Sequence, residues 1–128
     1  LFYIMFSSHL YCYSPSKSLL EVCMAKFLIS GSYGPEALEA AASQGFQERI
    51  SYVTALAESL GMTIEAAYYA FGDDDIVLIG DGDSDAAIAL SLAVNASGAV
   101  AVRVTPLITA AEMDAAAEKI PDYQPPTT

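Results

Sequence analysis

The spacing of hydrophobic residues changes several times along this chain, and each change predicts a different element. Four short runs rich in β-forming residues predict strands, at 26–32, 63–71, 75–80 and 99–107. After the first run, apolar residues recur at steps of three and four as far as Leu60, which is typical of a helix that packs one face on a core. A second helical pattern covers 85–96, and a third follows residue 109.

Turn and cap residues refine these boundaries. Gly45 is expected to divide the first helical stretch into a short helix and a longer one. Asp83 offers an N-cap oxygen to the helix predicted over 85–96, and Gly98 is expected to end that helix. Thr109 and Glu112 have the spacing of a capping box, which would open the last helix.

The predicted order is β-α-β-β-α-β followed by a helix, which predicts an α+β fold. Two β-α-β units with right-handed crossovers form a four-stranded antiparallel sheet with helices on one face, the ferredoxin-like arrangement. The C-terminal helix is added to that unit. The other face of the sheet is left bare.

Six aspartates stand in the stretch 69–87 and raise the question of a metal site. The segment that begins at Asp81 resembles a calcium-binding EF-hand loop, but Ala86 stands where the bend needs Gly and Leu92 where a bidentate Glu is needed. Asp residues also stabilise hairpin turns and helix N-termini. We therefore expect structural aspartates and no metal.

The charge balance narrows the possible partners. The chain has 16 acidic and 5 basic residues, a formal net charge of −11 and a pI near 4.1, so it should repel nucleic acids and anionic membranes. No apolar run approaches the ~20 residues of a membrane span. These features predict a cytoplasmic protein with no nucleic-acid or membrane partner.

Residues 1–23 differ from the rest, because they contain both cysteines and the one histidine. A signal peptide, a lipoprotein signal and an upstream extension of translation are three interpretations, and we favour the last, with the domain at 24–119 and a disordered tail at 120–128. Such a domain has no Cys or His, which excludes Ser-His-Asp and thiol catalysis and Cys/His zinc sites. We expect no cofactor and assign no catalytic residue.

Alternation along the strands predicts which side chains reach the bare face. Phe27, Ile29, Val100, Val102 and Val104 are expected to face the helices, with Arg103 on the bare side. Glu65 and Tyr69 are expected there too, because Glu is seldom buried unpaired.

The candidate ligand-binding residues are therefore Tyr33, Glu65, Tyr69 and Arg103. A structural interpretation of each stays open, above all an Arg103–Glu65 ion pair and an interface role for Tyr69. Arg49 is expected to be a surface or helix-pair contact.

Three stretches carry a family resemblance: "MAKFLISGSY", "AESLGMTIEAAYYAFG" and "AFGDDDIVLIGDGDSDAAIALSLAVNASGAVAVRVTPLITAAEMDAA". Together they resemble the GYD domain family, small bacterial proteins of largely unknown function. The family's Gly-x-Tyr-Asp motif falls on residues 72–75, where Asp74 replaces the Tyr. The resemblance implies a dimeric α/β-barrel, in which the bare sheets of two copies face each other.

Three functions fit these features. The one that we favour is a homodimeric small-molecule-binding or regulatory protein, with a small organic acid as a possible ligand. The second is a cofactor-independent isomerase or monooxygenase that uses Tyr and Arg on aromatic or lactone substrates. The third is a structural assembly module.

Overall fold

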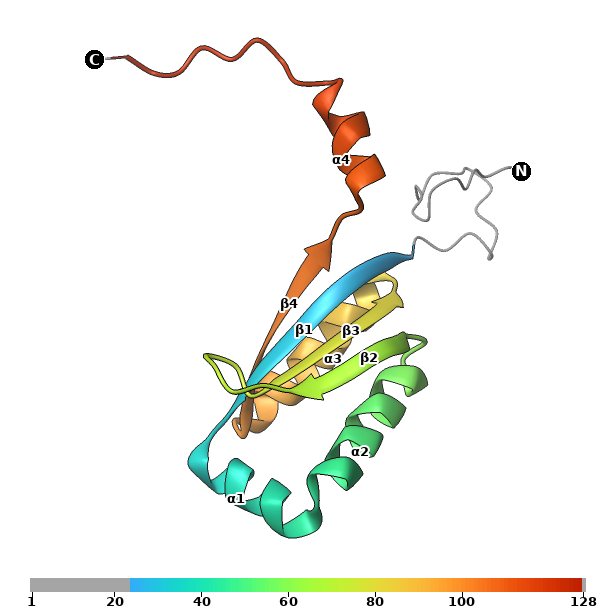
Figure 1. Ribbon diagram of the computed structural model, residues 1–128, viewed down its shortest axis with the longest axis vertical. Helices are drawn as coiled ribbons and strands as arrows, with labels where there is room; N and C mark the ends of the chain where they lie inside the picture. Colours follow the sequence, from blue (N-terminus) through green and yellow to red (C-terminus); the bar gives the residue numbers. More distant parts are fainter. Residues whose placement is uncertain (1–23, 128) are drawn as a thin grey trace.

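The computed structural model describes residues 24–127, which form a four-stranded sheet and four helices (Figure 1). In chain order the elements are β1 (Ala25–Tyr33), α1 (Pro35–Gln44), α2 (Phe46–Ser59), β2 (Thr63–Tyr69), β3 (Ile76–Gly82), α3 (Ser84–Ser97), β4 (Val100–Leu107) and α4 (Ala110–Ala117). This order confirms the predicted α+β, ferredoxin-like fold. The segment 1–23 lies outside the described residues, so its interpretation stays a prediction.

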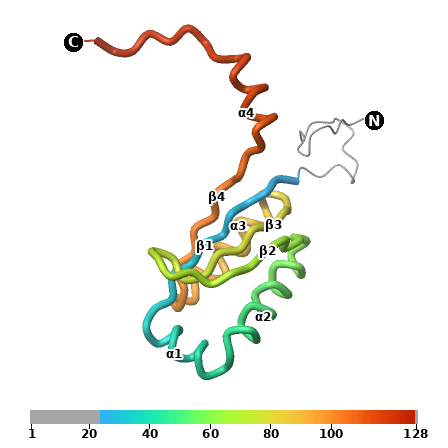
Figure 2. The backbone as a smooth tube through the Cα atoms, in the orientation of Figure 1, coloured from blue at the N-terminus to red at the C-terminus, as the bar shows by residue number. Residues whose placement is uncertain are grey.

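The sheet has the strand order β2-β3-β1-β4, and every neighbouring pair is antiparallel. Helices α2 and α3 lie on one side of it (Figure 2), and their residues join the hydrophobic core of that side. Within residues 24–127 no helix covers the opposite side, which we call the open face. The strands β2 and β4 are the two edges.

The core lies between the sheet and the two longer helices. Phe27 and Ile29 of β1 are buried there, together with Leu78 of β3. They pack against Ala57 of α2 and Leu90 of α3. Burial of each large apolar side chain stabilises the fold by about 1.5–3 kcal/mol, so this layer carries much of the stability. Val100 is buried and Val102 and Val104 pack on the core, which confirms the face predicted for these three valines.

The predicted caps are present. The Asp83 carboxylate accepts a hydrogen bond from the backbone N–H of Ala86 at 2.8 Å, and Thr109 and Glu112 form a reciprocal capping box. Gly45 separates α1 from α2 with a φ of 109°, a conformation that side-chain-bearing residues rarely adopt. These local signals predicted the helix boundaries well.

The connection between β2 and β3 is longer than expected. A three-residue turn was predicted, but the strands end at Tyr69 and resume at Ile76. The reason is Asp75, whose N–H donates to the Gly31 carbonyl and whose carboxylate accepts from the Tyr33 N–H, each at 2.8 Å. Asp75 thereby holds the loop against the end of β1, a structural role for one of the six aspartates.

Helix α4 continues away from the sheet beyond the end of β4 (Figure 1), and none of its residues is buried. Residues 120–127 contain no helix or strand. Across residues 24–127, no helix is both long enough and apolar enough to cross a lipid bilayer.

Candidate functional site

A β-bulge in β2 decides which of its side chains face the helices. Ile64 pairs with Gly80 and Ala66 pairs with Ile79, so Glu65 is an extra residue with no partner in the register. Beyond the bulge the alternation is reversed, and Tyr69 pairs with Ile76, a core residue on the helix side. The prediction that Tyr69 lies on the open face is therefore wrong, whereas Glu65 does lie there.

Gly80 makes room for this bulge. A Cβ at residue 80 would lie 2.8 Å from the Thr63 carbonyl oxygen and 2.9 Å from the Ile64 Cδ1, closer than the Cβ atoms of folded proteins come to other non-bonded atoms. Glycine in a strand often marks such an approach of a neighbouring backbone. The side of the sheet on which Tyr69 lies thus depends on Gly80 in the adjacent strand.

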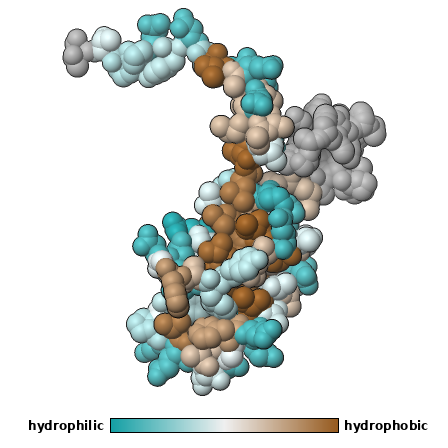
Figure 3. Space-filling view, in the orientation of Figure 1, coloured by the Kyte–Doolittle hydropathy of each residue, from teal (hydrophilic) through white to brown (hydrophobic). Residues whose placement is uncertain are grey.

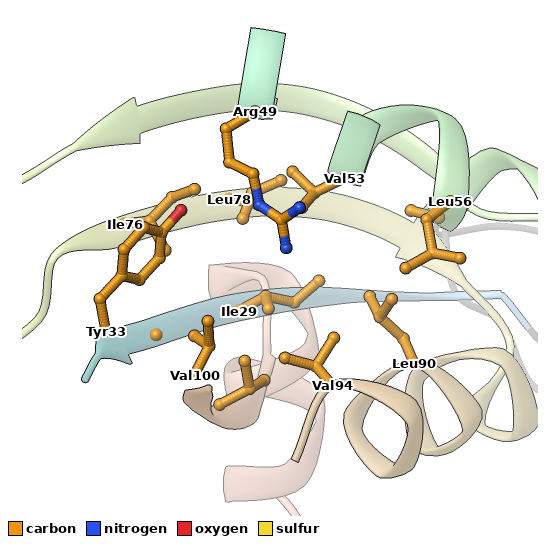
Figure 4. A pocket seen from close by; sticks show the side chains of 13 residues that line it. Ile29, Tyr33, Arg49, Val53, Leu56, Ile76, Leu78, Leu90, Val94 and Val100 are labelled. Atoms are coloured by element: carbon orange, nitrogen blue, oxygen red, sulfur yellow. The ribbon is translucent and has the colours of Figure 1, made fainter. Parts of the chain in front are cut away.

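A cavity of about 60 Å³ lies between the sheet, α2 and α3 (Figure 4). We call it the helix-side cavity. Its lining includes nine large apolar side chains: Ile29, Val53, Leu56, Ile76, Leu78, Leu90, Val94, Val100 and Val102. Tyr33 and Arg49 are the polar residues among those that line it. A second cavity of about 180 Å³, the side cavity, lies beside α1 and shares Tyr33, Arg49 and Val100 with the first.

Tyr69 is held against the start of α2, near Tyr33 and Arg49. Its ring meets the Phe46 ring edge to face with centroids 5.0 Å apart, and its hydroxyl donates to the Phe46 carbonyl at 2.9 Å. Burial raises the pKa of Tyr69 to about 12; an interaction with the Tyr33 hydroxyl adds to the shift, and the charge of Arg49 opposes it. Tyr69 is consequently neutral at physiological pH, and its environment includes both polar residues of the cavity.

Arg49 projects from α2 toward the helix-side cavity (Figure 4). Its guanidinium carbon lies 4.8 Å from the centre of the Tyr52 ring, a cation–π distance. It forms no ion pair with any carboxylate of residues 24–127. The sequence analysis missed this residue as a site candidate. The signal was present, because Arg49 lies three residues after Phe46 and four before Val53, within the apolar stripe of the helix.

The open face holds Arg103 in a different arrangement from the one predicted. One guanidinium nitrogen of Arg103 donates to both carboxylate oxygens of Asp74, at 2.7 and 2.8 Å. The expected Arg103–Glu65 pair is wrong, since β4 and β2 are opposite edges of the sheet. Glu65 instead pairs with Lys26, which also lies 3.1 Å from Asp81. These carboxylates raise the pKa of Lys26.

Of the four predicted ligand residues, the structure brings only Tyr33 and Tyr69 together. Arg103 and Glu65 lie on the other side of the sheet, each in an ion pair of its own. Over the part of the chain that the structure describes, no group of three or more His, Cys, Asp or Glu side chains is arranged to hold a metal ion. Larger hollows lie beside Lys26 and beside α3, but the two cavities that meet at Tyr33 and Arg49 are the ones that combine a predicted site residue with a guanidinium that has no ion-pair partner within residues 24–127.

A comparison with protein families matches residues 27–117 to the GYD domain. This chain belongs to the GYD domain family. The matched region begins within β1 and ends with α4, and so includes residues of all four strands and the lining of both cavities. No curated protein and no solved structure matches the chain. In this GYD domain, Asp74 is the residue that binds Arg103.

Proposed function

We propose that this GYD domain is a cytoplasmic, homodimeric protein of binding or regulatory function, and that each copy holds a small organic molecule in the helix-side and side cavities. The observation that carries the proposal is the position of Arg49, a guanidinium that lies where two cavities meet and that forms no ion pair within residues 24–127. A preformed apolar pocket with a few convergent polar groups is the usual form of a small-molecule site.

The sizes of the cavities limit the ligand. Volumes of about 60 and 180 Å³ are below the ~300–1,000 Å³ of pockets that take drug-sized molecules. The site therefore suits a compact ligand with an apolar end in the helix-side cavity and a polar group near Arg49. Tyr69 stays protonated at neutral pH because its pKa is raised, and it lines neither cavity; its hydroxyl holds the start of α2 through the Phe46 carbonyl.

The dimer is supported by the composition of the open face. Figure 3 shows hydrophobic surface over the strands, with polar surface between the hydrophobic areas. The strand registers place five apolar residues on the open face: Leu28, Ala66, Val77, Ile79 and Ala101. The loop at one end of this face presents Phe71, which is fully exposed in the single chain. Apolar side chains exposed together on one face of a domain mark an interaction site, and pairing with a second copy covers both faces at once.

Native mass spectrometry of protein purified from its own host tests both parts of the proposal. The expected spectrum is that of a dimer carrying one small ligand per chain. As a control, Val53→Phe fills the helix-side cavity and should abolish ligand retention while the dimer remains. A ligand-free wild-type spectrum under gentle ionisation would contradict the binding function, and a monomer at micromolar concentration would contradict the dimer.

A further inference from the structure

We propose that Arg49 binds a carboxylate, and that the ligand is a small monocarboxylic acid with a short branched or cyclic apolar body. This inference rests on the proposed function and specifies the chemistry of its site. The acid would then bind on the helix side of the sheet and not on the open face, where Arg103 is already paired with a carboxylate.

The charge environment of Arg49 is the first argument. The chain has more than three times as many acidic as basic residues, and the basic residues of the sheet, Lys26 and Arg103, are paired with carboxylates. None of the described residues that line the two cavities is acidic. A half-buried guanidinium in apolar surroundings needs an anion, because desolvation without a partner is costly. A ligand carboxylate would supply it.

The geometry of Arg49 is the second argument. The guanidinium of Arg49 lies against the Tyr52 ring, and within residues 24–127 its N–H groups form no ion pair. A planar fork of this kind matches the two oxygens of a carboxylate. Tyr33 lines both cavities together with Arg49, and a phenol hydroxyl is able to donate a hydrogen bond to an anion.

The lining restricts the rest of the molecule. Next to Arg49 the helix-side cavity is walled by Val53, Ile29 and Val94, so the part of the ligand that enters it is apolar. Its volume of about 60 Å³ admits a few carbon atoms and excludes a long chain. Arg49 is the one basic side chain among the described lining residues, so the site offers a single countercharge and disfavours dicarboxylates.

Isothermal titration calorimetry with 3-methylbutanoate and its neutral amide, 3-methylbutanamide, tests the proposal. The two probes have the same shape and differ in charge. Wild-type protein should bind the acid at least ten times more tightly than the amide. Arg49→Met should lose that preference, and Arg49→Lys should keep part of it. The matched control is Arg103→Met, which removes a guanidinium from the other face and should leave both affinities unchanged.

The outcomes separate this proposal from the function on which it rests. Equal binding of acid and amide, unchanged in Arg49→Met, would overturn carboxylate recognition and leave a small-molecule site in place. Binding of neither probe, together with ligand-free protein in native mass spectrometry, would overturn both. If Arg49→Met does not fold, as judged by circular dichroism, the wild-type preference for acid over amide still decides the question.

Discussion

The hydroxyl of Tyr69 lies 2.9 Å from the carbonyl oxygen of Phe46, and their rings meet edge to face. This contact ties the end of β2 to the first turn of α2, the helix that carries Arg49. Tyr69 does not line the helix-side cavity itself, but it holds α2, which forms part of the cavity wall.

Replacing Tyr69 by Phe should lower the free energy of unfolding by about 0.5–1.5 kcal/mol at neutral pH, the usual contribution of one hydrogen bond. Thermal or urea denaturation measures this difference. Tyr123→Phe is the control, because that side chain is 70% exposed in the C-terminal segment and should change stability little.

The difference in stability between the wild type and Tyr69→Phe should also depend on pH. The pKa of Tyr69 is raised from 10.0 to about 12 in the folded protein, so the folded state holds this proton more tightly than the unfolded state. The contribution of Tyr69 to the free energy of unfolding is therefore complete below pH 10, and it is lost as the pH rises toward 12. The difference between wild type and Tyr69→Phe should therefore shrink over that interval. A difference that grows with pH would show that the pKa is lowered instead.

Gly80→Ala should destabilise the domain by about 1–3 kcal/mol, because the new Cβ would meet the Thr63 carbonyl across the bulge. Gly72→Ala is the matched control, since a Cβ there would have no atom within 4 Å and the backbone conformation is an ordinary one. Equal midpoints of urea denaturation for the two variants would contradict the account of the bulge.

A double-mutant cycle should couple Arg103 to Asp74 and not to Glu65. The Arg103 side chain is 68% exposed in the single chain, so the coupling energy between Arg103→Met and Asp74→Asn should be under about 1 kcal/mol but measurable. The cycle of Arg103→Met with Glu65→Gln should be additive, because these residues lie on opposite edges of the sheet. The reverse result would mean that the strand order differs in solution.

Phe71→Asp should weaken the dimer at least ten-fold in sedimentation equilibrium. Exposed aromatic residues at an interface often contribute most of its affinity, and Phe71 lies at the end of the proposed one. Ile120→Asp introduces the same charge at a side chain that is 74% exposed beyond α4 and should leave the dimer intact. A dimer equally stable in both variants would place the interface elsewhere.

Local signals were sufficient to predict most of the fold. The cap at Asp83 and the capping box of Thr109 and Glu112 depend on residues three positions apart, so the sequence contains the whole interaction. The inward faces of β1 and β4 follow from uninterrupted alternation. The side of the sheet on which Tyr69 lies does not follow from alternation, because the bulge before it depends on Gly80 in another strand.

The candidate site was harder to predict. The ferredoxin-like strand order already implies that Arg103 and Glu65 lie on opposite edges, so their expected pairing conflicted with the predicted fold. Arg49 could have been identified by its position within the apolar stripe of α2. What no pattern in the sequence reveals is the space beside it, because a cavity depends on how α2, α3 and the sheet pack together.

The measurement that tests the central claim most directly is a titration of isotope-labelled protein with 3-methylbutanoate, followed by backbone amide chemical shifts. The account predicts saturable shifts at the residues around the two cavities, with the largest changes near Arg49, Val53 and Tyr33. The amide shifts of Glu65 and Phe71, which lie on the open face and in the loop at its end and do not flank a lining residue, should stay unchanged. Shifts centred on the open face, or none at millimolar acid, would contradict a ligand site between the sheet and its helices.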